Sequence, residues 1–185
     1  MSPEFLLELA KTEFIRSKTT PYHPFKYIAL ATVNAKDGSP EVRTVVTRAI
    51  SEELGVIFYT DSRSPKVQQM MKEEKVSLLF YHPKKQLQIR MKGRARIIAE
   101  EEQAFQDGLD QVQDTGKIKD YSTVASPSSN LLAGIGDQPY GQKVNFAAIE
   151  VTPEELDVLL LENGGHYRAK FTKEIDGWEA NPLVP

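Results

Sequence analysis

The sequence predicts a mainly β protein, an antiparallel barrel with a few helices set between its strands, and three observations predict it. Eight or so short segments are rich in β-branched and aromatic residues and are bounded by turn residues. Tight turns such as Asp37-Gly38 and Asn163-Gly164-Gly165 join several of them, which favours antiparallel neighbours. A sheet of this many antiparallel strands favours a closed or nearly closed barrel, because closure removes exposed strand edges.

The composition predicts one ordinary globular domain spanning residues 1–185. Hydrophobic residues make up 40% of the chain and charged residues 26%. The net charge of −3 provides no general attraction to nucleic acid or to an anionic membrane, so we expect neither partner. The chain has no cysteine, which excludes disulfides, zinc–thiolate sites and thiol nucleophiles.

The N-terminal segment predicts a cytoplasmic location. "MSPEFLLELAKTEF" carries acidic residues early and lacks the basic start and long apolar run of a signal peptide. No apolar stretch approaches the roughly 20 residues that span a bilayer.

The first third of the chain predicts a helix followed by a three-stranded meander. Residues 2–17 have a helical apolar period, with Ser2 as the cap and Pro3 in the first turn. Two prolines in "TTPYHPF" end this helix. The expected antiparallel strands are 26–33, 42–50 and 56–60.

The remainder predicts a second helix that Ser64 caps and Pro65 begins, and then the other strands. Gly93 lies inside a long strand, which indicates a bulge or a close backbone approach. Residues 99–112 are helical in pattern, and 113–143 are polar loops with a short helix. The expected strands are 76–81, 86–98, 144–151, 155–162 and 166–173.

Common catalytic signatures are absent from the sequence, among them the glycine-rich nucleotide loops and the nucleophile elbow. His23, His82 and His166 lie in or next to turns and share no metal-ligand spacing. We therefore expect surface histidines and no metal site. The acidic run at 99–103 fits a helix N-terminus, where negative charge is favoured.

The strand segment "RTVVTR" carries an arginine at each end. Arg43 and Arg48 differ in strand parity, so they share a face only if the strand bends. Two solvated surface charges are the ordinary interpretation, and fixed donors for an anion are the alternative.

The segment "YTDSRSPK" joins a strand to a helix start, where backbone N–H groups and the helix dipole attract an anion. Ser62, Arg63, Ser64 and Lys66 add hydroxyl and cationic donors within one turn. An ordinary capped helix with exposed charges would have the same sequence pattern. A meander brings Arg43 to the same end of the sheet, however, and the combination predicts a phosphate site.

Four motifs in this order resemble the pyridoxamine 5′-phosphate oxidase family of FMN-binding split barrels. They are "RTVVTR", "VIFYTDSRSPK", "VSLLFY", and the strand in which Gln88 stands five residues before Gly93. The resemblance covers about residues 26–98 and returns faintly in "GWEANPLVP". It implies an antiparallel split β-barrel and a homodimer that binds FMN at the subunit interface.

Carried over by position, the resemblance implies a set of FMN-binding residues. Arg43 and Lys66 would hold the phosphate, helped by Ser64 and Arg63. The other implied contacts are the backbone of Thr44, Val45 and Val46 and the side chain of Arg48 along the ring, Tyr59 and Thr60 at the ribityl and phosphate region, Gln88 and Ser128 from the partner subunit, and Lys170 near the ring.

Departures from the family pattern concern the substrate more than FMN. Pro65 stands where the family has the arginine of an Arg-Lys pair, and Leu159 stands at the place of a tryptophan beside the flavin. The family's substrate-binding Tyr, Arg and Ser have no counterparts in 104–125. We therefore expect an FMN-dependent oxidoreductase of unknown small-molecule substrate. The alternatives are vitamin B6 phosphate oxidation, or a non-catalytic barrel that binds flavin, haem or F420.

Overall fold

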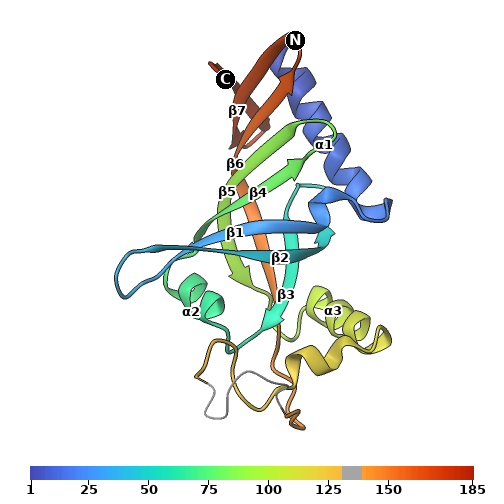
Figure 1. Cartoon of the computed structure of the whole chain (residues 1–185), viewed down its shortest axis with the longest axis vertical. Helices are drawn as coiled ribbons and strands as arrows, with labels where there is room; N and C mark the ends of the chain where they lie inside the picture. The colour runs from blue at the N-terminus through green and yellow to red at the C-terminus, as the bar shows by residue number, and fades with distance from the viewer. Residues whose placement is uncertain (131–138) are drawn as a thin grey trace.

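The computed structural model describes residues 1–130 and 139–185, in which eight strands form one antiparallel sheet (Figure 1). The strand order is β3-β2-β1-β4-β5-β6-β7-β8, and β3 also pairs with β6. This extra pairing closes β1 to β6 into a barrel, from which β7 and β8 extend as a further hairpin. The strands are β1 (Tyr27–Val33), β2 (Pro40–Ile50), β3 (Val56–Asp61), β4 (Lys75–His82), β5 (Leu87–Ile97), β6 (Phe146–Glu162), β7 (Gly165–Glu174) and β8 (Gly177–Leu183). The prediction of an antiparallel split barrel is confirmed.

Three helices lie around this barrel, one beside the upper part of the sheet and two near its lower end in the view of Figure 1. They are α1 (Pro3–Thr19), α2 (Pro65–Lys72) and α3 (Gln103–Asp114), with short 3₁₀ turns η1 (Pro24–Lys26) and η2 (Lys117–Tyr121). The hydroxyl of Ser2 accepts from the amide of Phe5 at 3.4 Å, as expected for a cap of α1. None of the helices in these residues is long and apolar enough to cross a membrane.

Strand β2 is irregular beside Arg48, one of the two arginines that could share a face only if the strand bends. Its pairing with β3 shifts register between Thr47 and Ala49, so Arg48 lies at the irregularity. Before this shift, Val42 and Thr44 are exposed while Val45 is buried, which places Arg43 and Val45 on the inner face of the barrel. A bulge of this kind redirects side chains near it.

Gly93 marks a close approach of two strands, as the sequence predicted. A β-carbon at this position would lie 2.1 Å from the carbonyl oxygen of Thr152, which no side chain tolerates. The pairing of β5 with β6 also shifts between Lys92 and Gly93. The expected strands 144–151 and 155–162 are therefore one strand, because Pro153 is accommodated at this irregularity instead of ending the strand.

One helix boundary and one additional strand also differ from expectation. Helix α3 begins at Gln103 rather than 99, since Glu102 is its N-cap residue. Strand β8 was not expected, because Pro182 and two turn-like residues, Gly177 and Asn181, weaken its strand pattern. It pairs along β7 at the end of the sheet order, where a proline is tolerated. Residues 131–138 of the predicted loop region lie outside the described residues.

The apolar core fills the barrel and continues beneath α1. Its largest fully buried side chains include Phe14 of α1, Phe25 of η1, and Phe58 and Phe80 of the strands. A second, smaller cluster lies beneath α3 and η2 and contains Phe105, Tyr121 and Phe146. Both clusters hold the helical segments against fixed strands, and this positions the polar groups described next.

Candidate functional site

The start of α2 and the inner face of β2 bring cationic and hydroxyl groups together. Lys66 donates from Nζ to Oγ1 of Thr60 at 3.0 Å, and that oxygen lies 3.2 Å from Oγ of Ser64. Ser64 is the N-cap residue of α2, yet its side chain makes no capping bond. Its hydroxyl, although buried, is therefore available within the group rather than committed to the helix backbone.

Arg43 approaches the same place from β2. Its guanidinium donates to Oγ1 of Thr32, to Oε1 of Gln69 at 3.2 Å and to Oε2 of Glu41 at 2.9 Å. Thr32 and Gln69 are both buried, so they fix the guanidinium from the strand and helix sides. Sequence reasoning missed these two residues, although Gln69 lies beside the apolar stripe of α2 and is an unusual polar residue there.

The electrostatics show that the two cations act on one region. Burial lowers the pKa of Lys66 most, the charge of Arg43 lowers it further, and only Asp61 opposes them. Among the described residues Lys66 forms no ion pair with a carboxylate, whereas Asp61 is engaged by Arg63. Of the two cations, Arg43 is paired with the partly exposed Glu41, while Lys66 is compensated only by the charge of Asp61, and this arrangement favours an anion at Lys66.

The guanidinium of Arg63 bonds to Asp61 and to the 123–125 segment. It forms a two-pronged pair with Asp61, at 3.0 Å from Nε and 2.7 Å from Nη2. The same guanidinium donates to the carbonyl oxygens of Thr123 at 2.8 Å and Val124 at 3.1 Å. Its donors therefore connect the β3–α2 turn to the 123–125 segment, and they do not contact Lys66 or Ser64.

Arg48 and Tyr59 lie together on the flank covered by α3. The guanidinium carbon of Arg48 is 5.5 Å from the centroid of the Tyr59 ring, a cation–π distance. Burial raises the pKa of Tyr59, and the charge of Arg48 acts in the opposite sense. Gly108 of α3 packs so closely on the ring that a β-carbon there would lie 2.9 Å from it. The Tyr59 ring thus contacts α3, while the hydroxyl of Thr60, the next residue, accepts a hydrogen bond from Lys66.

The remaining implied residues lie on the outer face of the sheet or in loops. Gln88 pairs with exposed Tyr81, and β5 is three strands away from β2 in the sheet order. Lys170 of β7 forms an ion pair with Glu155 at 3.3 Å. Ser128 is exposed, with a backbone φ of 67°. Within one chain these three residues do not reach the group around Lys66.

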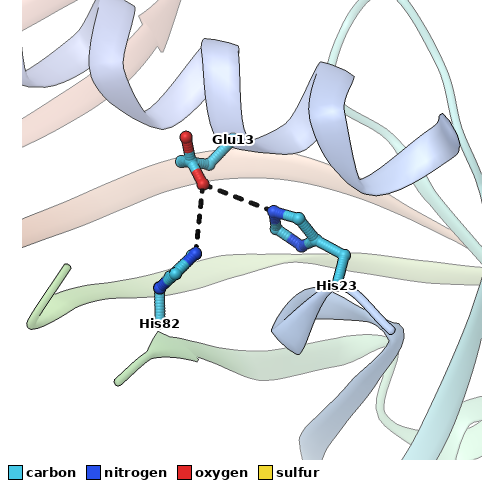
Figure 2. A group of neighbouring side chains, drawn as sticks. All are labelled: Glu13, His23 and His82. Carbon is cyan, nitrogen blue, oxygen red and sulfur yellow. Dashed lines mark hydrogen bonds and ion pairs between the residues drawn. The ribbon is translucent and has the colours of Figure 1, made fainter. Parts of the chain in front are cut away.

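A buried polar cluster connects α1, η1 and the end of β4, and it contradicts the expectation of surface histidines (Figure 2). Nε2 of His23 and Nε2 of His82 lie 3.3 and 3.5 Å from one carboxylate oxygen of Glu13. Glu13 is fully buried, and Lys85 and Arg16 approach its other oxygen. The expectation holds only for His166, which is exposed.

Parity along β4 was the signal that sequence reasoning missed. Val76, Leu78 and Phe80 face the core, and His82 continues their alternation. Burial alone would raise the pKa of Glu13, but hydrogen bonds from Lys85, His23 and Arg16 hold it below its usual value.

Glu13, His23 and His82 have the spacing of three metal ligands, but their surroundings favour a hydrogen-bonded network. The backbone amide of Phe25 donates to Nδ1 of His23 at 3.2 Å, and that of Lys85 donates to Nδ1 of His82 at 3.3 Å. Because Nδ1 of each ring accepts from a backbone amide, the Nε2 atoms that face Glu13 are the donor positions, and Nε2 of His23 bonds to Glu13. A metal-bound histidine requires the opposite arrangement, with its second nitrogen as a donor.

Comparison with known proteins agrees with this architecture. Residues 9–99 match the family model of the pyridoxamine 5′-phosphate oxidase FMN-binding domain. The chain is 28% identical to a pyridoxine/pyridoxamine 5′-phosphate oxidase of Gluconobacter oxydans, over 91% of this chain and 88% of that protein. A similar protein of Legionella pneumophila is 26% identical over 85% of this chain and 77% of its own length.

Solved structures show the same fold at lower identity. PhzG of Burkholderia lata, solved with tetrahydrophenazine-1-carboxylic acid, has a TM-score of 0.72 and 19% identity, over 97% of this chain and 92% of that one. A pyridoxamine 5′-phosphate oxidase-related, FMN-binding protein of Nostoc punctiforme has a TM-score of 0.67 and 21% identity, over 96% of both chains. The closed barrel, the matched family model and these relatives lead to one conclusion: the chain belongs to the pyridoxamine 5′-phosphate oxidase-like family of FMN-binding domains.

Proposed function

We propose that this protein is an FMN-binding flavoprotein and an FMN-dependent oxidoreductase of a small molecule. One observation carries the proposal: Arg43 and Lys66 converge beside the start of α2, and Lys66 has no carboxylate ion pair in the described part of the chain. A phosphate monoester fits this donor set, since it accepts charge-assisted bonds from both cations. The hydroxyl of Ser64, free of a capping bond, adds a neutral donor.

The residues of this chain bind and orient, and FMN, when bound, supplies the hydride or electron transfer. Arg43 and Lys66 would hold its phosphate, while Thr60 orients the ammonium group of Lys66. Thr44 to Val46 and Arg48 would follow the ring along β2. The positive charge of Arg48 would stabilise negative charge on a reduced ring.

The second part of the proposal is a homodimer. The outer sheet face exposes 63% of Tyr27, 67% of Val42, 40% of Leu79 and 47% of Tyr81, and strand register places these side chains on one face. A pocket of about 320 Å³ on this face has an apolar floor and a charged rim that includes Arg90 and Glu155. Apolar surface with a polar rim is typical of an interface.

A dimer would also explain why Gln88, Ser128 and Lys170 lie away from Lys66 in one chain. The proposal is that a second copy supplies Gln88 and Ser128 to the site.

Light scattering should find a dimer that Leu79→Asp dissociates, with loss of FMN affinity. The control is Ile175→Asp, in a fully exposed turn position, which should leave the dimer intact. A wild-type monomer that binds FMN fully would contradict this part.

Oxidation of vitamin B6 phosphates is the second candidate, because relatives that cover most of the chain carry that name. Oxygen consumption with pyridoxamine 5′-phosphate tests it, and no turnover by the FMN-loaded protein removes it. A cytoplasmic location is likewise part of the proposal, to be tested by cell fractionation.

The test of FMN binding uses the phosphate donors. The purified protein should be yellow with flavin absorbance bands, whereas a Soret band would indicate haem. Arg43→Ala should weaken FMN binding about tenfold or more, since it removes charge-assisted hydrogen bonds. Arg94→Ala is the matched control, because Arg94 is an exposed arginine whose guanidinium is paired with Glu74 and Glu154. Equal FMN affinity in both variants would overturn the proposal.

A further inference from the structure

A pocket lies at the other end of β2 from Arg43. It has a volume of about 470 Å³, within the usual range for small-molecule sites. Its walls are the end of α1, the connection from α1 to β1, the last residues of β2, and Gln111 of α3. The pocket is therefore formed by segments that are distant in sequence, and the N-terminal third of the chain provides most of it.

The charge of this pocket is of one sign. Lys18, Lys26 and Arg48 line it, and its lining residues include no aspartate or glutamate. Hydroxyl groups of Thr19, Thr20 and Thr47 add neutral hydrogen-bonding groups to the same walls. Three cations without a carboxylate partner inside the pocket favour an anion there.

Two unpartnered atoms point to the same place. In the described residues, the buried side-chain nitrogen and oxygen atoms without a hydrogen-bond partner are Oγ1 of Thr47 and Nε of Arg48. Both residues line the pocket, and both lie at the β2 irregularity. An unpaired buried donor is unfavourable, and such groups in native proteins mark places where a ligand or water completes the bonding.

The distance along β2 places the pocket relative to FMN. Arg43 and Arg48 are five residues apart, which is about 16 Å at the rise of a strand. A flavin nucleotide whose phosphate lies at Arg43 and whose ring follows β2 therefore ends near Arg48. The pocket begins where that ring would end, so its contents would lie beside the ring.

We propose that this pocket binds the anionic group of a small organic acid and holds that acid next to the flavin. Lys18 and Lys26 supply the charge, and small movements of Thr47 and Arg48 bring their unpartnered atoms to the bound group. The inference rests on the proposed function and extends it, since it names the substrate class as a small organic acid. It assigns the binding of the acid to the connection between α1 and β1.

The experiment uses benzoate as the probe and benzamide as its neutral analogue. Calorimetry with the FMN-free full-length protein should show benzoate binding, with benzamide at least about tenfold weaker. Lys18→Gln/Lys26→Gln should weaken benzoate about tenfold, which corresponds to about 1.4 kcal/mol. The control is Lys36→Gln/Lys84→Gln, which changes the net charge equally at two exposed lysines outside the pocket and should stay within about twofold of wild type.

A second readout tests the position beside the flavin. Benzoate should shift the absorbance bands of bound FMN in wild type, and the pocket variant should need about tenfold more benzoate for the same shift. The anion site is overturned if benzoate fails to bind, or if the pocket variant and the control bind it equally. Its placement is overturned if benzoate binds without moving the flavin bands.

Failure of the proposed function would look different. A protein that binds benzoate through Lys18 and Lys26 but never binds FMN would keep the anion site and remove the flavin role. Arg43→Ala separates the flavin role from the anion site in one variant. It should weaken FMN binding and leave benzoate binding to the FMN-free protein unchanged.

Discussion

Nε2 of His23 donates to Oε2 of Glu13 across 3.3 Å inside the protein, and this bond ties helix α1 to the connection that follows it. Figure 2 shows His82 approaching the same oxygen from the end of β4. That connection also forms a wall of the pocket that Lys18 and Lys26 line. The cluster therefore holds together the segments on which the proposed anion site depends.

Acid should destabilise the protein through His82. Burial lowers the pKa of His82 below the ordinary 6.5, the charge of Glu13 opposes this, and His23 and Lys85 lower it further. The unfolded chain then binds a proton near pH 6.5 that the folded chain does not yet bind. Stability should be complete above pH 6.5 and fall as the pH drops from 6.5 toward the lowered pKa.

Chemical denaturation between pH 7.5 and 5 measures this effect. His82→Gln keeps an N–H donor for Glu13 but cannot titrate, so its free energy of unfolding should fall less steeply with acid. His166→Gln is the control, since His166 is exposed. The hypothesis is wrong if the two variants show the same pH slope.

The affinity for FMN should have an optimum in pH that Lys66 limits on the alkaline side. In the protein without FMN, burial and the charge of Arg43 lower the pKa of Lys66 below the ordinary 10.5 of a lysine. A bound phosphate favours the charged ammonium, so affinity should fall as the pH rises through the lowered pKa. Affinity should also fall below about pH 6, where the phosphate loses its second charge.

Titration of FMN fluorescence from pH 5.5 to 10 measures this profile. Lys66→Met removes the titrating group and should flatten the alkaline limb while lowering affinity throughout. An alkaline limb that persists in Lys66→Met would assign it to another group.

Removal of Arg63 should loosen the segment that leads to Ser128. Arg63 joins Asp61 to the carbonyl oxygens of Thr123 and Val124, and the Val124 amide bonds to the oxygen of Pro139 at 2.9 Å. Arg63→Ala should accelerate hydrogen exchange of the Val124 amide on the order of tenfold. Arg94→Ala should not change that rate. Unaltered exchange in Arg63→Ala would show that the segment is held by other contacts.

Gly93→Ala should be one of the most destabilising single-methyl additions in the barrel. The added carbon would meet the backbone oxygen of Thr152 at 2.1 Å, so β5 and β6 must separate locally. We expect a loss of about 3 kcal/mol in the free energy of unfolding. Gly164→Ala is the control, because its β-carbon would meet nothing within 4 Å, and it should change stability by less than about 0.5 kcal/mol. Similar losses in both variants would refute the steric explanation.

The sequence by itself determined most of the strands, their turns and the helix start that carries Ser64 and Lys66, although it missed β8. Alternation in β2 placed Arg43 and Val45 on one face but did not say which face is buried, and the capped helix start predicted the cluster of Ser64 and Lys66. Gly93 predicted the close approach of two strands. These signals are local, because strand parity, caps and turn residues act over a few neighbouring residues.

Only the tertiary structure decided which distant groups meet. Barrel closure and the packing of α1 bring Glu13 to His82, and the fold gives Arg63 carbonyl partners about sixty residues away. The pocket at Thr47 and Arg48 likewise exists only because α1, its connection and α3 surround the end of β2. A buried polar group must find partners wherever the fold provides them, and no local pattern specifies a partner that lies far away in the chain.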